Sequence, residues 1–109
     1  MKNINIEINN TIYNITNGSD ASDNDLIIKK SDPNDIWFHF ENISSPHLIL
    51  DKVDGKISKK DLKQIALLLF NYKKSAPTNT NVIYTEIKNV KLTKIPGSVN
   101  VKNTRIIKF

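Results

Sequence analysis

The sequence predicts an α+β fold, in which an antiparallel or mixed sheet of about six to seven strands carries one principal helix. Several short segments alternate apolar and polar residues with a period of two, which is typical of half-buried strands. Only one segment, about residues 58–73, has apolar residues at helical spacing over several turns. A chain of 109 residues has room for one modest core, so we expect a single domain over residues 1–109.

The first predicted element is a β-hairpin. Three isoleucines alternate with polar residues near the N-terminus: Ile4, Ile6 and Ile8. Asn9 and Asn10 follow, and asparagine tolerates the left-handed backbone that a tight turn requires. Residues 11–15 then return as the second strand.

A polar loop that contains Gly18 leads into a short helical turn ending at Lys29 and Lys30. Ser22 or Asp23 is the predicted cap of this turn, because short polar side chains accept a hydrogen bond from the first free backbone N–H groups. The two lysines stand at the end where the helix dipole favours cations. Pro33 then ends the turn.

Residues 35–50, DIWFHFENISSPHLIL, hold the only tryptophan and both histidines, and they predict a second antiparallel hairpin. With a period of two, one face of this hairpin can be buried, and it consists of Ile36, Phe38, Phe40, Leu48 and Leu50. The opposite face carries a carboxylate, an indole and two imidazoles, from Asp35, Trp37, His39 and His47. This combination is too polar for a core and too aromatic for an ordinary surface. We therefore expect the functional site on the outer face of this hairpin.

The principal helix follows a turn at Gly55. Ser58 and Asp61 match a capping signature, in which the serine hydroxyl accepts from the backbone N–H three residues later. The apolar stripe of the helix recurs at helical spacing and consists of Leu62, Ile65, Ala66, Leu69 and Tyr72. We expect this stripe to cover one face of the sheet.

The remaining elements are strands. Residues 81–87 are rich in β-branched and aromatic side chains and predict a strong strand. We expect residues 89–97 to be basic and irregular. Residues 99–101 and 104–109 predict a last hairpin around Lys102 and Asn103.

The composition narrows the class of protein. The chain has no cysteine, so a disulfide framework and a thiolate metal site are excluded. No segment approaches the roughly 20 apolar residues of a membrane span, and the N-terminus lacks the apolar core of a signal peptide. We therefore expect a cytoplasmic protein without a membrane partner.

The charge is unevenly distributed along the chain. Up to Gly55 there are 4 lysines and 9 acidic residues, whereas the rest has 11 lysines and 1 arginine against 2 acidic residues. A basic half of this kind indicates a polyanionic partner. A solvated lysine surface would explain the same charges equally well.

Several motifs along the chain resemble the NFACT-R domain, which occurs on the C-terminal side of ribosome-quality-control proteins and also in stand-alone proteins. The matching residues follow in order: Gly18, Asn24 and Asp25, the DIWFH of residues 35–39, Ser44 and Ser45, His47, the VIYT of residues 82–85, the lysines Lys88 and Lys91, and Pro96 with Gly97. The stand-alone eukaryotic type with a coiled-coil domain is the most similar in architecture. Ser19 and Asp51 depart from the family pattern, since basic residues are usual there.

The resemblance implies nucleic-acid binding without a known catalytic activity, and it bears on the aromatic and imidazole side chains. Trp37 could stack on a base, or it could be covered by the long helix or a lysine stem. His39, His47 and Asp35 would suit a metal or acid–base site. We prefer imidazoles that donate to phosphate or sugar, or that hold the hairpin together, and we expect no cofactor and no metal.

Further contacts are expected around this face. Ser44 and Ser45 could receive a phosphate in the turn, or they could be ordinary turn residues. Tyr84 and Thr85 point to opposite faces of their strand, so only one can belong to the site, and we favour Tyr84. Three lysines are the best candidates for phosphate contacts, with Lys102 and Arg105 in second rank: Lys88, Lys91 and Lys94.

Three functions remain open from the sequence. The preferred one is a non-catalytic module that binds nucleic acid, with tRNA or rRNA as the expected ligand and DNA as the other possibility. We expect it to act in ribosome quality control and translation, where the ribosome or a protein would be a further partner. The first alternative is a protein-interaction adaptor that uses the same aromatic face. The second is an enzyme that depends on the histidines and Asp35. The sequence leaves the oligomeric state open.

Overall fold

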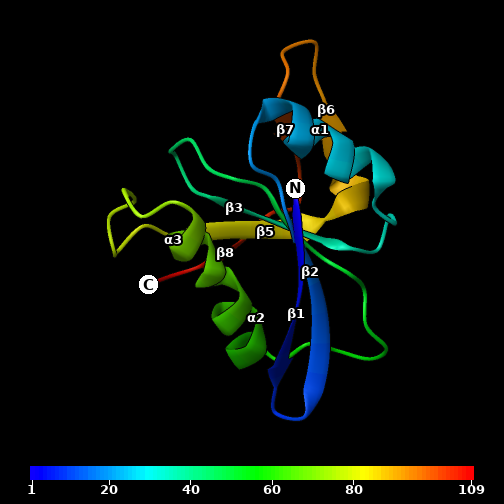
Figure 1. Ribbon diagram of the computed structural model, residues 1–109, viewed down its shortest axis with the longest axis vertical. Helices are drawn as coiled ribbons and strands as arrows, with labels where there is room; N and C mark the ends of the chain where they lie inside the picture. The colour runs from blue at the N-terminus through cyan, green and yellow to red at the C-terminus, as the bar shows by residue number, and fades with distance from the viewer.

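The computed structural model describes all 109 residues. Six strands form one antiparallel sheet in the order β1-β2-β4-β3-β5-β8, and β6 and β7 form a separate two-stranded sheet (Figure 1). The strands are β1 (Lys2–Ile8), β2 (Thr11–Asn17), β3 (Ile36–Phe40), β4 (Leu48–Leu50), β5 (Val82–Glu86), β6 (Val90–Leu92), β7 (Val99–Val101) and β8 (Arg105–Ile107). The helices are α1 (Ala21–Lys30), α2 (Lys59–Ala66) and α3 (Leu68–Tyr72), with a short 3-10 turn η1 (Ile87–Asn89). The predicted α+β class and antiparallel sheet are confirmed.

The N-terminal hairpin forms as predicted. β1 and β2 pair from Lys2 opposite Asn17 to Ile8 opposite Thr11. Asn9 and Asn10 make the turn with φ values of 51° and 66°, the left-handed backbone that asparagine tolerates. The hairpin places β2 beside β4, and so beside the centre of the sheet.

The DIWFH hairpin occupies the middle of the sheet. β3 and β4 pair antiparallel, with Trp37 opposite Ile49 and Phe38 opposite Leu48. β2 covers the outer edge of β4 and β5 covers the outer edge of β3. The hairpin therefore lies in the interior of the sheet, and each of its two faces packs against other elements of the fold.

One face of the sheet packs on α2 and α3. Its core includes the predicted inward side chains Phe38, Phe40, Leu48 and Leu50, all with no exposed surface. Ser58 caps α2 as predicted, since its hydroxyl accepts from the Asp61 N–H at 3.1 Å. The expected apolar stripe of the helix faces the sheet, because Leu62, Ile65, Ala66 and Leu69 are buried in this core and Tyr72 packs against it.

The expectation of one principal helix over residues 58–73 is wrong in two respects. The segment is divided at Leu67, whose φ of −58° and ψ of −25° are those of a 3-10 turn, and the Phe70 N–H donates to the Leu67 carbonyl. The tighter turn sets the Phe70 ring between Phe40, at 4.8 Å, and Phe109, at 5.2 Å. The longest helix is instead α1, which covers the other face of the sheet. No helix is long and apolar enough to cross a membrane.

α1 packs on the face of the sheet that carries Trp37. It begins after Asp20, whose carboxylate accepts from the Asp23 N–H at 2.9 Å, so the cap lies two or three residues earlier than Ser22 or Asp23. This start places two isoleucines over the sheet, where they form a second core with residues from β3, β4, η1 and β6: Ile27, Ile28, Trp37, Ile49, Ile87 and Val90. In Figure 1, α1 lies beside β6 and β7 at the top, and α2 lies at the lower left. The face expected to be a surface is therefore a second core.

The C-terminal strands pair differently from the prediction. β7 pairs with β6, within the segment expected to be irregular, and β8 pairs with the edge of β5. The predicted hairpin between β7 and β8 does not form. Thr85 lies at the crossing, where its hydroxyl contacts the carbonyl oxygens of Lys102 at 3.3 Å and Asn103 at 3.2 Å. These contacts hold the chain where it passes from the small sheet to the large one.

Candidate functional site

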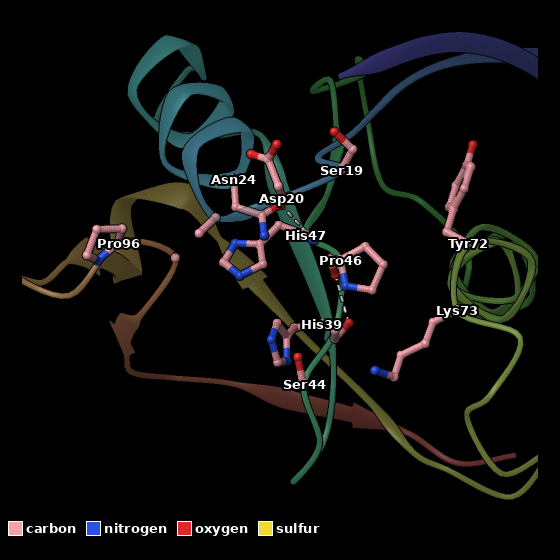
Figure 2. A pocket seen from close by; sticks show the side chains of 13 residues that line it. Ser19, Asp20, Asn24, His39, Ser44, Pro46, His47, Tyr72, Lys73 and Pro96 are labelled. Atoms are coloured by element: carbon pink, nitrogen blue, oxygen red, sulfur yellow. Dashed lines mark hydrogen bonds between the residues drawn. The ribbon is translucent and has the colours of Figure 1, made fainter.

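A polar cleft opens where the end of β3 and the start of β4 meet the N-terminus of α1 and the loop between β6 and β7 (Figure 2). Its volume is about 490 Å³. The walls come from residues 19–24, both histidines, the loop of residues 44–46, the end of α3, and Pro96 with Gly97. Segments between Ser19 and Gly97 that lie far apart in the chain therefore converge on the two imidazoles.

His47 is the buried wall of this cleft, with 1% of its surface exposed. The Trp37 indole Nε1–H donates to His47 Nδ1 at 3.2 Å. An indole nitrogen can only donate, so His47 Nδ1 must accept and the proton of the neutral ring must be on Nε2. The His47 backbone is held as well, because its carbonyl accepts from the Gly18 N–H at 3.0 Å.

His39 lies against both of these rings. It stacks on Trp37 with ring centres 5.3 Å apart and an angle of 19°, and its centre is 5.1 Å from that of His47. His39 Nδ1 lies 2.5 Å from the backbone oxygen of Phe40, which can only accept, so Nδ1 carries the proton. The Nε2 of the neutral His39 ring is then an acceptor. The predicted proximity of the two histidines is confirmed.

Both imidazoles are neutral at pH 7. Burial and, to a smaller extent, the neighbouring His39 lower the pKa of His47 to about 4, whereas the charge of Asp25 acts in the opposite direction. Burial also lowers the pKa of His39, and the contact with the Phe40 carbonyl partly offsets this. Removing the rings from water disfavours the charged form of each.

Asn24 is a cleft residue that the sequence had not assigned to the site. It is 7% exposed, and its side-chain oxygen accepts from the His47 backbone N–H at 3.3 Å. Its amide nitrogen has no partner within the chain and points to the cleft beside the His47 ring (Figure 2). The available signal was its place beside Asp25 among the motif residues that carry the family resemblance.

Gly18 makes room for Asn24. A β-carbon added at position 18 would lie 2.0 Å from the Asn24 side-chain oxygen, far inside a van der Waals contact. The glycine is therefore required by close packing. It links the loop before α1 to the position of His47.

The two serines differ in what they offer. The Ser45 hydroxyl accepts from the Phe40 N–H at 3.1 Å and donates to the Pro46 carbonyl at 2.7 Å, so it stabilises the turn. Ser44 is exposed on the cleft wall, and no group of the chain bonds to its hydroxyl. Both lie at the cleft, and only Ser44 has its hydroxyl free for a ligand.

Trp37 and Asp35 lie away from the cleft opening. Trp37 is 1% exposed, so the expectation of an exposed ring that stacks on a base is wrong. It is covered by α1 and Val90, whereas α2, the helix expected to cover the sheet, packs on the opposite face. The Asp35 carboxylate accepts from the backbone N–H groups of Lys52 and Asp32, both at 2.8 Å. Asp35 therefore holds the opposite end of β3 and does not join the histidines.

Tyr84 lies on the other face of the sheet. It pairs in register with Phe38 and stacks on that ring with centres 5.9 Å apart. Tyr84 therefore points away from the histidines, and the preference for Tyr84 over Thr85 as a site residue is wrong. Thr85 pairs with Trp37 and shares its face, but it is 5% exposed. Neither residue lines the cleft.

The expected lysines are exposed and lie outside the cleft wall. Lys88 Nζ is 3.5 Å from the Glu86 carboxylate, and Lys91 lies on β6. Lys94 is in the loop that reaches the cleft through Pro96. The lysine that lines the cleft is Lys73, just after α3, which was not among the predicted site residues.

Comparison with known proteins identifies the family. The model of the NFACT protein RNA binding domain matches residues 4–103. The chain belongs to this family. Similar proteins include coiled-coil domain-containing protein 25 from mouse, 35% identical over 92 residues, and from zebrafish, 33% identical over 87 residues. These matches cover 79% and 74% of this chain but 44% and 42% of the relatives, so the chain spans about half of their length.

A solved structure shares the fold of this NFACT RNA-binding domain. The C-terminal part of the fibronectin/fibrinogen-binding protein from Streptococcus suis matches with a TM-score of 0.75 and 21% identity. The match covers 88% of this chain and 40% of that one. The resemblance expected from the DIWFH motif and the serines and histidine that follow it is therefore confirmed for the family and for the fold.

Proposed function

We propose that the chain is a non-catalytic RNA-binding module and that RNA is held at the cleft of His39 and His47. One observation carries the proposal. In a chain of an RNA-binding family, two neutral imidazoles with open ring nitrogens meet in a polar cleft. Ser44 and Asn24 add further hydrogen-bonding groups to the same wall. Such an arrangement binds a polar ligand through directed hydrogen bonds.

The basic half of the chain supplies the electrostatic part of the proposed interaction. Lys73 is on the cleft wall, and Lys94 stands in the loop that reaches it. Lys88 and Lys91 would extend the contact to phosphates farther along the strand of RNA. Phosphate contacts of this kind position a nucleic acid and make its affinity depend on salt.

The proposed setting is ribosome quality control in the cytoplasm, with tRNA or rRNA as the ligand and the ribosome as the larger partner. Membership in the NFACT RNA-binding domain family supports this setting. Within the proposal, Trp37 and Asp35 act by holding the hairpin in place, since both are buried and hydrogen-bonded. DNA is the competing ligand that the experiment below includes.

The two alternative functions have less support. An adaptor that docks through the aromatic face would need Trp37 at the surface, but α1 covers it. The Streptococcus suis relative is named for binding fibronectin and fibrinogen, and its likeness at 21% identity concerns the fold. An enzyme that used Asp35 with both histidines would need the three side chains together, and the Asp35 carboxylate is hydrogen-bonded at the other end of β3.

Fluorescence anisotropy with labelled RNA tests the proposed function. Labelled single-stranded RNA, tRNA and duplex DNA, matched to one another in length or in total charge, are each titrated with the full chain at several salt concentrations. We expect binding to RNA that weakens steeply with salt and that exceeds binding to duplex DNA. Equal affinity for every polyanion would show that binding is non-specific charge attraction. Absence of RNA binding at low salt would rule out the proposed function.

A further inference from the structure

We propose that the cleft accepts one unpaired nucleobase, whose hydrogen-bonding edge contacts His39, His47 and the Asn24 amide. This inference rests on the proposed RNA-binding function and adds the chemical group that enters the cleft. It concerns a base-binding site within the chain, in contrast to the phosphate contacts expected of the lysines.

The first argument is the inventory of free polar atoms. His47 Nε2 carries a proton because Nδ1 accepts from Trp37, and His39 Nε2 is an acceptor because Nδ1 donates to Phe40. The Asn24 amide nitrogen donates as well. None of these three atoms has a partner within the chain. The cleft therefore offers two donors and one acceptor from rigidly held side chains.

The second argument is that these atoms remain open to the cleft. The only side-chain nitrogen or oxygen atom that is both fully buried and without a partner is Asn17 Oδ1. The free atoms of His39, His47 and Asn24 are thus reached from outside, although His47 and Asn24 are 1% and 7% exposed. All three residues line the same cleft (Figure 2). A polar atom removed from bulk water destabilises the folded state unless it has a hydrogen-bond partner, which a ligand or a water molecule in the cleft would supply.

The third argument distinguishes a base from a phosphate. The oxygens of an RNA phosphodiester only accept, so such a group would face the lone pair of His39 Nε2 without a proton between them. The two imidazoles are neutral, and the charged side chains of the cleft wall are Lys73 and Asp20, of opposite sign. The edge of a nucleobase presents both donors and acceptors, as this set requires.

The fourth argument concerns size and pairing. A cleft of about 490 Å³ falls within the range of small-ligand sites, roughly 300–1,000 Å³. A base in a duplex has its Watson–Crick edge occupied by its partner, so only a base from a single strand, loop or bulge can present that edge to the histidines. The inferred ligand is thus an unpaired nucleotide.

Nuclear magnetic resonance with uncharged nucleosides tests the inference. The full chain, labelled with ¹⁵N, is titrated with adenosine, guanosine, cytidine and uridine, and separately with dimethyl phosphate, a diester without a donor, at the same ionic strength. We expect at least one nucleoside to shift the ring nitrogen signals of His39 and His47 and the Asn24 side-chain amide. We expect dimethyl phosphate to leave these signals unchanged.

A variant pair supports the titration. His39→Phe keeps a ring that can stack on Trp37 but removes the acceptor, and we expect it to weaken nucleoside binding at least ten-fold. Tyr84→Phe is the control, because Tyr84 lies on the opposite face of the sheet. The titration of the unmodified chain decides the question if His39→Phe does not fold.

The outcomes separate this inference from the proposed function. If RNA binds but no nucleoside shifts the cleft signals, or if dimethyl phosphate alone shifts them, the base site is wrong and RNA binding stands. Unchanged nucleoside affinity in a folded His39→Phe would also overturn the site. If nucleosides bind at the cleft and no RNA binds, the site stands and the proposed function is wrong.

Discussion

Trp37 donates its indole N–H to His47 Nδ1 over 3.2 Å, and this bond joins the second core of the protein to its cleft. The bond fixes which nitrogen of His47 carries the proton and leaves that proton facing the ligand side. Trp37 itself stays buried at 1% exposure. Its role is therefore to position the imidazole, and contact with a ligand falls to other residues.

The substitution Trp37→Phe tests this positioning role. It leaves the buried His47 Nδ1 without its donor, and we expect the free energy of unfolding to fall by about 1–3 kcal/mol from that loss, with a further loss from reduced packing. Urea denaturation measures the change. In the folded variant, the ring nitrogen signals of His47 should show a mixture of tautomers, and a single unchanged tautomer would contradict the assignment.

The fluorescence of the single tryptophan separates a positioning role from base stacking. Because the side chain is 1% exposed, acrylamide should quench its emission only weakly. Saturating RNA should leave both the emission and its quenching by acrylamide nearly unchanged. Stacking on a base would strongly quench the emission. Loss of most of the Trp37 signal on RNA binding would therefore show that α1 moves away from the sheet.

Acidification should destabilise the fold through His47. Its pKa is about 4 in the folded protein and ordinarily 6.5, so the unfolded chain binds the proton more tightly. The corresponding stability is present above about pH 6.5 and is lost as the pH falls towards 4. The pKa difference corresponds to about 3 kcal/mol.

The variant His47→Gln isolates that contribution. Glutamine can accept from Trp37 and donate towards the cleft, but it does not titrate. Chemical denaturation at pH 7.5 and 4.5 should give a smaller loss of stability in the variant than in the unmodified chain. Carboxylates titrate in both proteins, so the difference between the two chains carries the information. Equal losses would contradict a lowered pKa for His47.

The contact between Gly18 and Asn24 predicts an unusual sensitivity to a single methyl group. Gly18→Ala places a β-carbon 2.0 Å from the Asn24 oxygen, and we expect a cost of about 1–3 kcal/mol with displaced Asn24 and His47 signals. Gly55→Ala meets no atom within 4 Å and costs about 1–2 kcal/mol from its φ of 81° alone. It should leave the cleft signals unchanged. In an Asn24→Ala background, Gly18→Ala should cost less than it does alone.

A pair of lysine variants tests the electrostatic part of the proposed RNA binding. Lys73 lines the cleft, whereas Lys56 lies in the loop that follows the opposite end of β4. Lys73→Gln should weaken binding to single-stranded RNA and reduce the slope of log affinity against log salt by about 0.7, the value for one phosphate contact. Lys56→Gln removes the same charge and should change the slope much less. Equal effects would place the RNA elsewhere.

The sequence determined much of the central architecture. The two-residue alternation of residues 35–50 predicted the hairpin and its inward side chains, because successive side chains of a strand point to opposite faces whatever surrounds it. The asparagine turn and the Ser58 cap were also predictable, since each depends on hydrogen bonds and backbone angles within a few residues. The proximity of His39 and His47 followed from the same alternation.

Only the tertiary structure decided what covers the second face of that hairpin. Alternation shows that Trp37 and Phe38 point in opposite directions, but it cannot show that α1 and β6 lie over Trp37, because that packing joins residues far apart in the chain. The pairing of β6 with β7 and of β5 with β8 is non-local for the same reason. The cleft depends on the position of α1 and on the pairing of β6 with β7, because α1 and the loop between those strands form part of its wall. Local residue pattern thus determined which side chains share a face, and long-range packing decided that the tryptophan is buried and that the histidines remain open to a ligand.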